Sequence, residues 1–269
     1  MGIHIIDFDI MEGMQWPPLM EVLRNSGVGH MRITAIKWAE DHDCHVLYSG
    51  HTRRRLSEYA TSVGIPFWSQ ETDLKGLKEV QPQEGEIVIV NCIWQLPHMF
   101  NLRNKSELLE FLVGARHLNP AAVTLATGPH GAKSNTADFS ESFSRCLAEL
   151  CTIFDSLEAG LPQHGLARAM VERIFFGPAM SRRLIMSTAS EVQAGPVDTR
   201  ESSVVDLPLK CGYCEGSISN DNVVFAKYSL FMLCNGVGES YEVELVGHHQ
   251  LVLKWASTPL IWVATWKST

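Results

Sequence analysis

The chain has 269 residues, of which 45% are hydrophobic and 19% are charged, so it can build a sizeable core and wholesale disorder is excluded. Its net charge of −8 argues against a surface that grips nucleic-acid phosphates along its whole length. The seven cysteines are an odd number, which favours buried thiols in a reducing compartment over a disulfide framework. The sequence predicts neither a membrane span nor a signal peptide.

The first half of the chain alternates between strand-like and helix-like patterns. Strands are predicted over residues 3–10, 31–36, 65–68, 86–92 and 121–125. Apolar residues repeated every three or four positions predict helices at 17–25, 56–63, 74–80 and 108–115. Residues 37–52 are polar, have no clear period and are expected to form a loop. Strands separated by helices predict a doubly wound α/β domain with a mostly parallel sheet.

The second half combines longer helices with closing strands. Helices are predicted at 138–157, 166–174 and 223–233. Residues 187–222 carry no clear element apart from a short one near 204–209. A strand is predicted at 241–246, followed by a β-hairpin made of 251–255 and 260–266. The sheet is therefore expected to end in antiparallel strands.

The loop after the first strand is a candidate cofactor site, because ligands of doubly wound domains sit at the carboxyl ends of the strands. Asp7, Asp9 and Glu12 precede Gly13 and could hold a nucleotide-like cofactor, as in methyltransferases. The same acids could instead cap the loop and pair with nearby amides. The loop has one glycine where a dinucleotide fingerprint has three, and residues 36–38 (Ile-Lys-Trp) lack an acid for ribose hydroxyls. These absences favour the structural interpretation, and no cofactor is expected.

A zinc site is suggested by Cys211 and Cys214, which form a CxxC pair. A structural zinc site needs four ligands, usually with a second pair at matched spacing. The remaining candidates do not provide that pair, since Cys234 is alone and His248 and His249 are adjacent. Buried or surface thiols are therefore favoured, and no metal is expected.

Two basic runs, residues 51–55 (His-Thr-Arg-Arg-Arg) and Arg182-Arg183, could contact phosphates or an import receptor. The acidic net charge favours ordinary solvated surface for both.

The sequence contains no G-x-S-x-G motif and no serine or cysteine in a recognisable activating setting, so no catalytic residue is assigned. Trp255, Trp262 and Trp266 on the closing hairpin are expected to be core residues, with an interface role as the alternative.

Several segments resemble the motifs of the plant GRAS family. Residues 4–7 (His-Ile-Ile-Asp), with Asp9, Gln15 and Trp16, are similar to its VHIID motif. Asp155 within 154–158, together with Glu172 and Arg173, is similar to the PFYRE region. Trp255, Trp262 and Trp266 lie in an ending similar to the SAW motif. The loop after the first strand and residues 176–178 (Phe-Gly-Pro) are most similar to the nodulation-signalling-pathway 2 and scarecrow-like branch.

The resemblance implies a methyltransferase-like, Rossmann-type α/β/α sandwich formed by a partial GRAS domain, 1–269. Its parts would be a VHIID and second leucine-rich part (1–131), a PFYRE region (132–200) and a SAW region (201–269). The first leucine-rich region is absent, so an N-terminal portion and most of the helical cap are expected to be missing. The motif residues would then have structural or interface roles.

The function implied by the resemblance is that of a non-catalytic nuclear regulator of transcription. Its partners would be other GRAS proteins, as homo- or heterodimers, and DNA-binding transcription factors, with DNA contact indirect or weak and no membrane contact. Two alternatives remain open. One is an S-adenosylmethionine-dependent methyltransferase that uses the loop from Asp7 to Gly13. The other is direct DNA binding, which requires the arginines to gather on one face.

Overall fold

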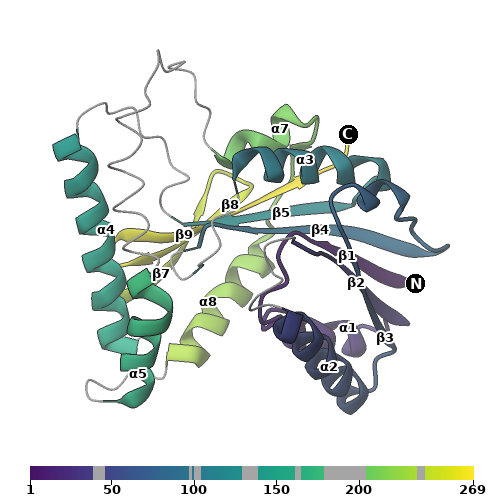
Figure 1. Ribbon diagram of the computed structural model, residues 1–269, viewed down its shortest axis with the longest axis horizontal. Coiled ribbons are helices and arrows are strands. Elements are labelled where there is room, and N and C mark those ends of the chain that lie inside the picture. Colours follow the sequence, from purple (N-terminus) through teal and green to yellow (C-terminus); the bar gives the residue numbers. More distant parts are fainter. Residues whose placement is uncertain are drawn as a thin grey trace.

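The computed structural model describes residues 1–38, 46–96, 99, 104–128, 139–160, 165–178, 204–234 and 240–269. A nine-stranded mixed sheet crosses this part of the chain, with helices on both faces (Figure 1). The strand order is β3-β2-β1-β4-β5-β9-β8-β7, and β6 pairs with β9. The predicted Rossmann-type α/β/α fold, with a mostly parallel sheet and antiparallel strands at its C-terminal end, is confirmed.

The parallel half of the sheet is built around β1. Its strands are β1 (Gly2–Asp7), β2 (His30–Ile36), β3 (Phe67–Thr72), β4 (Glu86–Trp94) and β5 (Ala122–Thr127). β1 pairs in parallel with both β2 and β4, and all six of its residues are buried. Both β1 and β4 are rich in β-branched residues, which favour strands in the interior of a sheet, and the sequence therefore predicted both clearly.

The antiparallel half contains β6 (Cys214–Glu215), β7 (Tyr241–Val246), β8 (Gln250–Trp255) and β9 (Thr258–Lys267). β9 lies between β5 and β8 and runs antiparallel to both. The turn between β8 and β9 places Ala256 and Ser257 at φ +44° and +68°, the left-handed pair that tight hairpins use. The predicted hairpin is therefore confirmed, whereas the two-residue strand β6 was too short to leave a sequence pattern.

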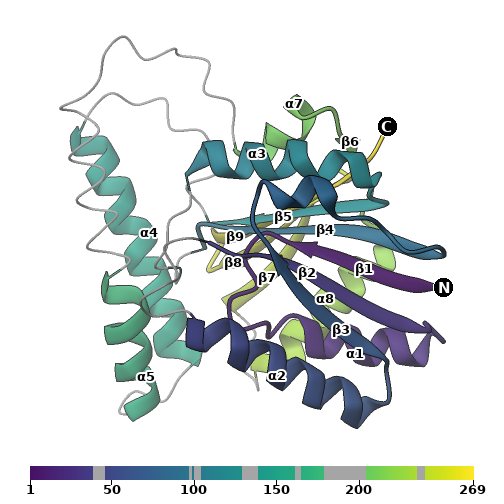
Figure 2. The same ribbon diagram turned by 45° about the vertical axis from the view of Figure 1, so that its right-hand side comes forward.

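Helices α1 (Trp16–Asn25) and α2 (Val46–Val63) cover one face of the parallel half (Figure 2). The prediction of a loop over residues 37–52 is wrong from Val46 onward. The start of this helix was not predicted because the sequence there is polar. Its buried residues Thr52, Leu56 and Ala60 recur every four positions and form only a narrow row, without a broad apolar face. The opposite face carries α3 (Lys105–Ala115), α7 (Leu207–Lys210) and the 3-10 helices Gly76–Glu79, Arg116–Leu118 and Val204–Asp206.

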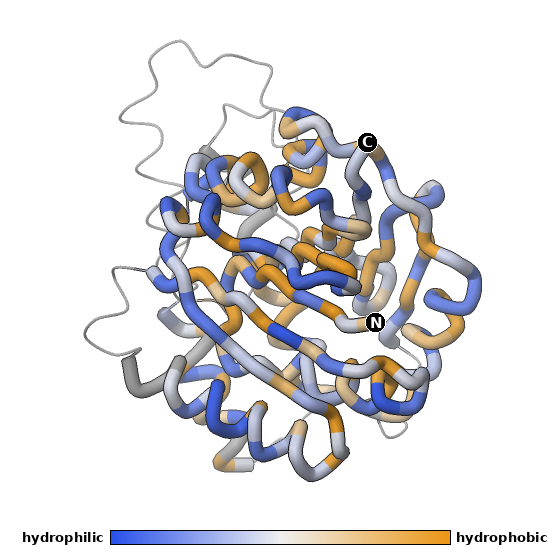
Figure 3. Tube along the Cα trace, turned by 90° about the vertical axis from the view of Figure 1, so that its right-hand side faces the viewer, coloured by the Kyte–Doolittle hydropathy of each residue, from blue (hydrophilic) through white to orange (hydrophobic). Residues whose placement is uncertain are grey.

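Three further helical segments lie by the antiparallel half. α4 (Phe139–Gly160) contacts β8 and β9, and α5 (Leu166–Met170) continues into a π-helical turn, Val171–Phe176. α8 (Asn220–Cys234) contacts β7. Hydrophobic residues concentrate in the strands at the centre of the sheet (Figure 3). Within the described residues, no helix has the length and apolar character needed to cross a membrane.

Candidate functional site

His4 lies at the centre of β1 and is fully buried beside a buried ion pair. Its Nδ1 accepts a hydrogen bond of 2.9 Å from Arg32, and its Nε2 donates to Oγ1 of Thr34 at 2.8 Å. Arg32 also donates from Nε to the Glu86 carboxylate at 3.0 Å. Because arginine can only donate, His4 must be neutral at Nδ1. The network joins β1, β2 and β4 through their side chains.

The charges of this network are set by burial and by its internal hydrogen bonds. Burial lowers the pKa of His4 to about 4, and the positive charge of Arg32 acts in the same direction. For Glu86, burial raises the pKa, but hydrogen bonds from Arg32, the Gln83 amide and His30 prevail and hold it at about 2. The Glu86 side chain has no exposed surface. Both ring nitrogens of His4 are thus used in buried hydrogen bonds within the protein, and neither is available to a ligand.

Asp7 ends β1 at the carboxyl edge of the sheet, where the strand order reverses between β1 and β4. Its Oδ1 accepts hydrogen bonds from the Asp9 amide at 3.2 Å and from Nδ2 of Asn91 at 3.5 Å. Its Oδ2 is buried and has no hydrogen-bond partner among the described residues. Burial, and secondly the charge of Asp9, raise the pKa of Asp7 to about 7. The carboxyl group could therefore exchange a proton near neutral pH.

Aromatic side chains pack against one another directly after β1 and β2, at this carboxyl edge. Phe8 follows β1 and Trp38 follows β2 after one residue; both are buried, and their rings meet edge to face at 5.0 Å. Nε1 of Trp38 donates to the Phe8 carbonyl at 3.0 Å, and Phe111 of α3 packs on Phe8 at 5.1 Å. A nucleotide-binding domain needs open space and an acid after the second strand. The two described residues after β2 are Lys37 and the buried Trp38, so the described part of this edge provides neither the acid nor the open space that S-adenosylmethionine would need.

The loop after β1 is held by its own acids, as the structural interpretation predicts. Asp9 Oδ1 accepts a hydrogen bond from the Met11 amide at 3.3 Å. Trp16 is buried near Asp7, where its indole slightly opposes the rise in the carboxyl pKa. Nε1 of Trp16 and Nε2 of Gln15 are also buried, and neither makes a well-formed hydrogen bond to another described residue. This small set of unsatisfied polar groups is closed off from the surface.

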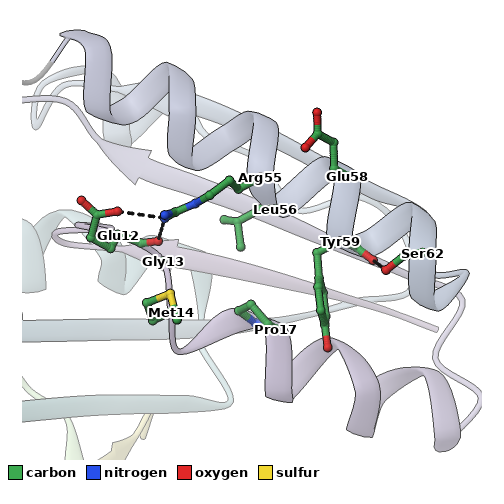
Figure 4. A pocket seen from close by; sticks show the side chains of 9 residues that line it. All are labelled: Glu12, Gly13, Met14, Pro17, Arg55, Leu56, Glu58, Tyr59 and Ser62. Atoms are coloured by element: carbon green, nitrogen blue, oxygen red, sulfur yellow. Dashed lines mark hydrogen bonds and ion pairs between the residues drawn. The ribbon is translucent and has the colours of Figure 1, made fainter.

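A pocket of about 440 Å³ lies on the outer side of the same loop, between α1 and α2 (Figure 4). Arg55 reaches from α2 to the loop and contacts the Glu12 carboxylate at 2.9 Å. Gly13 has φ +64°, and a Cβ there would lie 2.9 Å from Cγ2 of Thr52. The pocket is lined by Glu12, Gly13, Met14, Pro17, Arg55, Leu56, Glu58, Tyr59 and Ser62. It is separated from Asp7, so the two do not form one site.

The three arginines of the first basic run do not gather on one face. Arg53 pairs with Glu71 on β3 at 3.3 Å, Arg54 with Glu58 at 2.7 Å and Arg55 with Glu12 at 2.9 Å. Consecutive helix residues point about 100° apart, so the three side chains diverge. Each charge is already neutralised by an acid, which leaves no concentrated phosphate-binding surface here. The other run, Arg182-Arg183, lies outside the described residues.

The PFYRE-like residues lie at the far end of the molecule, on α4 and the π-helical turn. Asp155 and Arg173 are exposed, and Glu172 accepts a hydrogen bond from Arg168 at 2.6 Å. Neither Asp155 nor Arg173 belongs to the cluster around Asp7. The structure describes residues 132–200 only over 139–160 and 165–178. These residues are surface charges positioned next to a helix junction.

The tryptophans of the C-terminal hairpin have different environments. Trp266 is 1% exposed and Trp255 is 9% exposed, so both lie in the core. Trp255 packs on Tyr241 with ring centroids 4.6 Å apart, and the Tyr241 hydroxyl donates to the Ser156 carbonyl of α4 at 3.0 Å. Trp262 is half-buried. The hairpin therefore holds α4 against the sheet.

Among the residues that the structure describes, Cys211 and Cys214 do not belong to a group of three potential metal ligands. Cys211 is buried in the core, and Cys214 lies on β6 with its thiol near the Lys267 carbonyl. Among the described residues, the group of three potential ligands that the structure brings together is Glu215, His248 and His249. The sequence pattern suggested the two histidines only as a second ligand pair for the cysteines, which they do not provide, and it gave no sign that Glu215 would lie beside them.

The sequence also did not reveal which part of α8 is exposed. Five large apolar side chains on this helix are between 56% and 69% exposed: Val224, Phe225, Tyr228, Phe231 and Met232. At 100° per residue they occupy an arc of about 120° on one side of the helix. We call this set the α8 face. An apolar stripe of this kind on a folded protein marks a candidate interaction surface.

Comparison with known proteins places the whole chain in one group. The model of the GRAS domain family matches residues 1–267. The protein NODULATION SIGNALING PATHWAY 2 of Lotus japonicus is 33% identical over 98% of this chain and 52% of its own length. Scarecrow-like protein 26 of Arabidopsis thaliana is 36% identical over 99% of this chain and 55% of its own. The chain thus spans about half the length of these relatives.

A solved structure gives the same assignment. The crystal structure of SCL7 in Oryza sativa superposes with a TM-score of 0.72 at 25% sequence identity. The superposition covers 99% of this chain and 74% of that one. The sequence relatives support the predicted branch of nodulation-signalling-pathway 2 and scarecrow-like proteins.

Proposed function

The chain belongs to the GRAS domain family, and on that premise we propose that it is a nuclear regulator of transcription that acts through protein contacts. Its relatives include a DELLA protein of Arabidopsis thaliana, RGL3, as well as nodulation-signalling and scarecrow-like proteins. We propose other GRAS proteins and DNA-binding transcription factors as the partners. The α8 face is the observation that carries this proposal.

The α8 face has the composition of a protein interface. Two phenylalanines, a tyrosine and a methionine provide most of it, and these residue types are enriched where proteins bind one another. Only Asp221 and Lys227 are charged on the whole helix. A partner helix that presents an apolar stripe would bury these side chains without leaving a charge unpaired. Contact with DNA would then come through the partner, consistent with the paired arginines of α2.

Replacing Phe231 with aspartate is expected to weaken association at least about tenfold, because a charge would be buried in an apolar interface. The measurement is biolayer interferometry against the GRAS domain of rice SCARECROW-LIKE protein 7, with light scattering to detect self-association. Val113→Asp is the matched control, since Val113 is 61% exposed on α3 and Phe231 is 69% exposed on α8. Equal binding by both variants, or no association by the unchanged chain, would contradict the proposal.

The alternative of a methyltransferase rests on Asp7, whose raised pKa and position at the carboxyl edge are features of functional carboxylates. The packing of Phe8 against Trp38 argues against it. Calorimetric titration of S-adenosylmethionine into the folded chain is expected to give no heat of binding. Micromolar binding that disappears in Asp7→Ala would instead make the loop after β1 an active site.

A further inference from the structure

Glu215, His248 and His249 meet at the edge of the sheet opposite to Asp7. Nε2 of His248 lies 3.1 Å from Oε2 of Glu215, and Nδ1 of His249 lies 3.6 Å from the same oxygen. The three ligand atoms all lie within 4.8 Å of one another. Two imidazoles and a carboxylate at this spacing can bind one ion together.

The backbone holds the three residues in place from separate segments. Glu215 is fixed by the pairing of β6 with Trp266 on β9. The His248 carbonyl accepts a hydrogen bond from the Ile218 amide at 2.8 Å, and the His249 carbonyl accepts one from the Thr265 amide at 2.9 Å. The backbone of all three ligand residues is therefore already ordered. Binding an ion would cost little backbone conformational entropy.

His249 has the surroundings of a metal-binding histidine. Its ring packs edge to face on Trp266 at 5.1 Å, and only 12% of its side chain is exposed. Its Nδ1 is buried and has no hydrogen-bond partner within the described residues, although it faces Glu215. On its other side, Nε2 lies 3.0 Å from Nε2 of Gln250, an amide nitrogen that can only donate, so in this arrangement the ring proton is on Nδ1 and faces Glu215. Binding of a metal at Nδ1 displaces this proton and requires the Gln250 amide to turn, so that its oxygen accepts a proton on Nε2.

We propose that Glu215, His248 and His249 form a site for a zinc-class divalent transition-metal ion. Imidazole nitrogens select such ions over Mg²⁺ and Ca²⁺, which prefer oxygen ligands. Solvent completes the coordination, because His248 and Glu215 are 63% and 39% exposed. Cys214 does not take part, since successive strand residues point to opposite faces. The bound ion ties the β7–β8 turn to β6 and so fastens the antiparallel edge of the sheet.

Calorimetric titration with Zn²⁺ tests the proposal on tag-free protein. We expect one site, and His249→Gln or Glu215→Gln should weaken binding at least about tenfold. Exposed His51 on α2 provides the control, because His51→Gln also removes one imidazole but lies outside the cluster. Zn²⁺ should also raise the melting temperature of the unchanged chain and of His51→Gln, and raise it less in the other two variants at the same Zn²⁺ concentration.

Two results would overturn the proposal. If Zn²⁺ binds the cluster variants as tightly as the unchanged chain, the ion is held elsewhere among the eleven histidines. If Zn²⁺ does not bind at all, the three residues form only an ion pair between glutamate and imidazole. Melting in the presence of EDTA should be the same for all four proteins, which separates a lost ligand from a misfolded variant.

Discussion

Arg32→Leu is expected to lower the free energy of unfolding by about 3–5 kcal/mol, because it leaves the Glu86 carboxylate buried without its main partner. Glu86 has no exposed side-chain surface and also accepts hydrogen bonds from the Gln83 amide and His30. A backbone amide and an imidazole cannot replace a guanidinium, which is always charged. Urea denaturation followed by circular dichroism at pH 7 measures the loss.

The exposed pair on α2 is the control for this experiment. Arg54 bonds Glu58 at 2.7 Å, but both side chains are more than half exposed. Water screens such a pair, so Arg54→Leu should leave the urea midpoint unchanged. If Arg32→Leu behaves like Arg54→Leu, then Glu86 is solvated or protonated in the folded chain, and the three-strand network is not a source of stability.

Stability should change little between pH 5 and pH 7, because two buried groups act in opposite directions there. The folded-state pKa of His4 is about 4, below its ordinary 6.5, so the unfolded chain binds a proton that the folded chain does not. This makes stability rise with pH. The folded-state pKa of Asp7 is about 7, above its ordinary 3.8, so the folded chain holds the extra proton. This makes stability fall with pH.

Single substitutions should separate the two effects. In Asp7→Asn only the pKa shift of His4 remains, so the free energy of unfolding should rise by on the order of 2 kcal/mol from pH 5 to pH 7. In His4→Gln only the pKa shift of Asp7 remains, so the free energy of unfolding should fall by a similar amount over the same pH range. Glu86 titrates below this window, since its pKa is lowered to about 2 from 4.5. Urea titrations at the two pH values are the measurement, and parallel behaviour of both variants would refute the assignment.

The fold was predictable where one strand or helix carries its own pattern. β1 and β4 are rich in β-branched residues, and the turn at Ala256 and Ser257 lies between two apolar segments. The predictions failed where structure depends on distant partners. The start of α2 was missed because most of its residues are polar and only a narrow row of them is buried. β6 was missed because its two residues form a strand only through their pairing with Trp266 and Lys267 on β9.

The sites were less predictable than the fold for the same reason. Arg32 and Glu86 are 54 residues apart, and no local pattern shows that they will meet beside His4. Helix α8 was predicted near its observed position, but apolar residues surround it on every side in the sequence. Its exposed side could therefore not be chosen without knowing that β7 covers the other.

The position of β9 has a consequence for how the protein is made. This strand separates β5 from β8, yet it is the last element of the sheet to be synthesised. Until residues Thr258–Lys267 leave the ribosome, β5 is an open edge and the β7–β8 pair has no connection to the parallel strands. A nascent chain that stops after β8 would expose both edges to other unfinished chains. The sheet is thus completed only when its last strand is available, and premature termination before β9 should produce aggregates rather than a smaller folded protein.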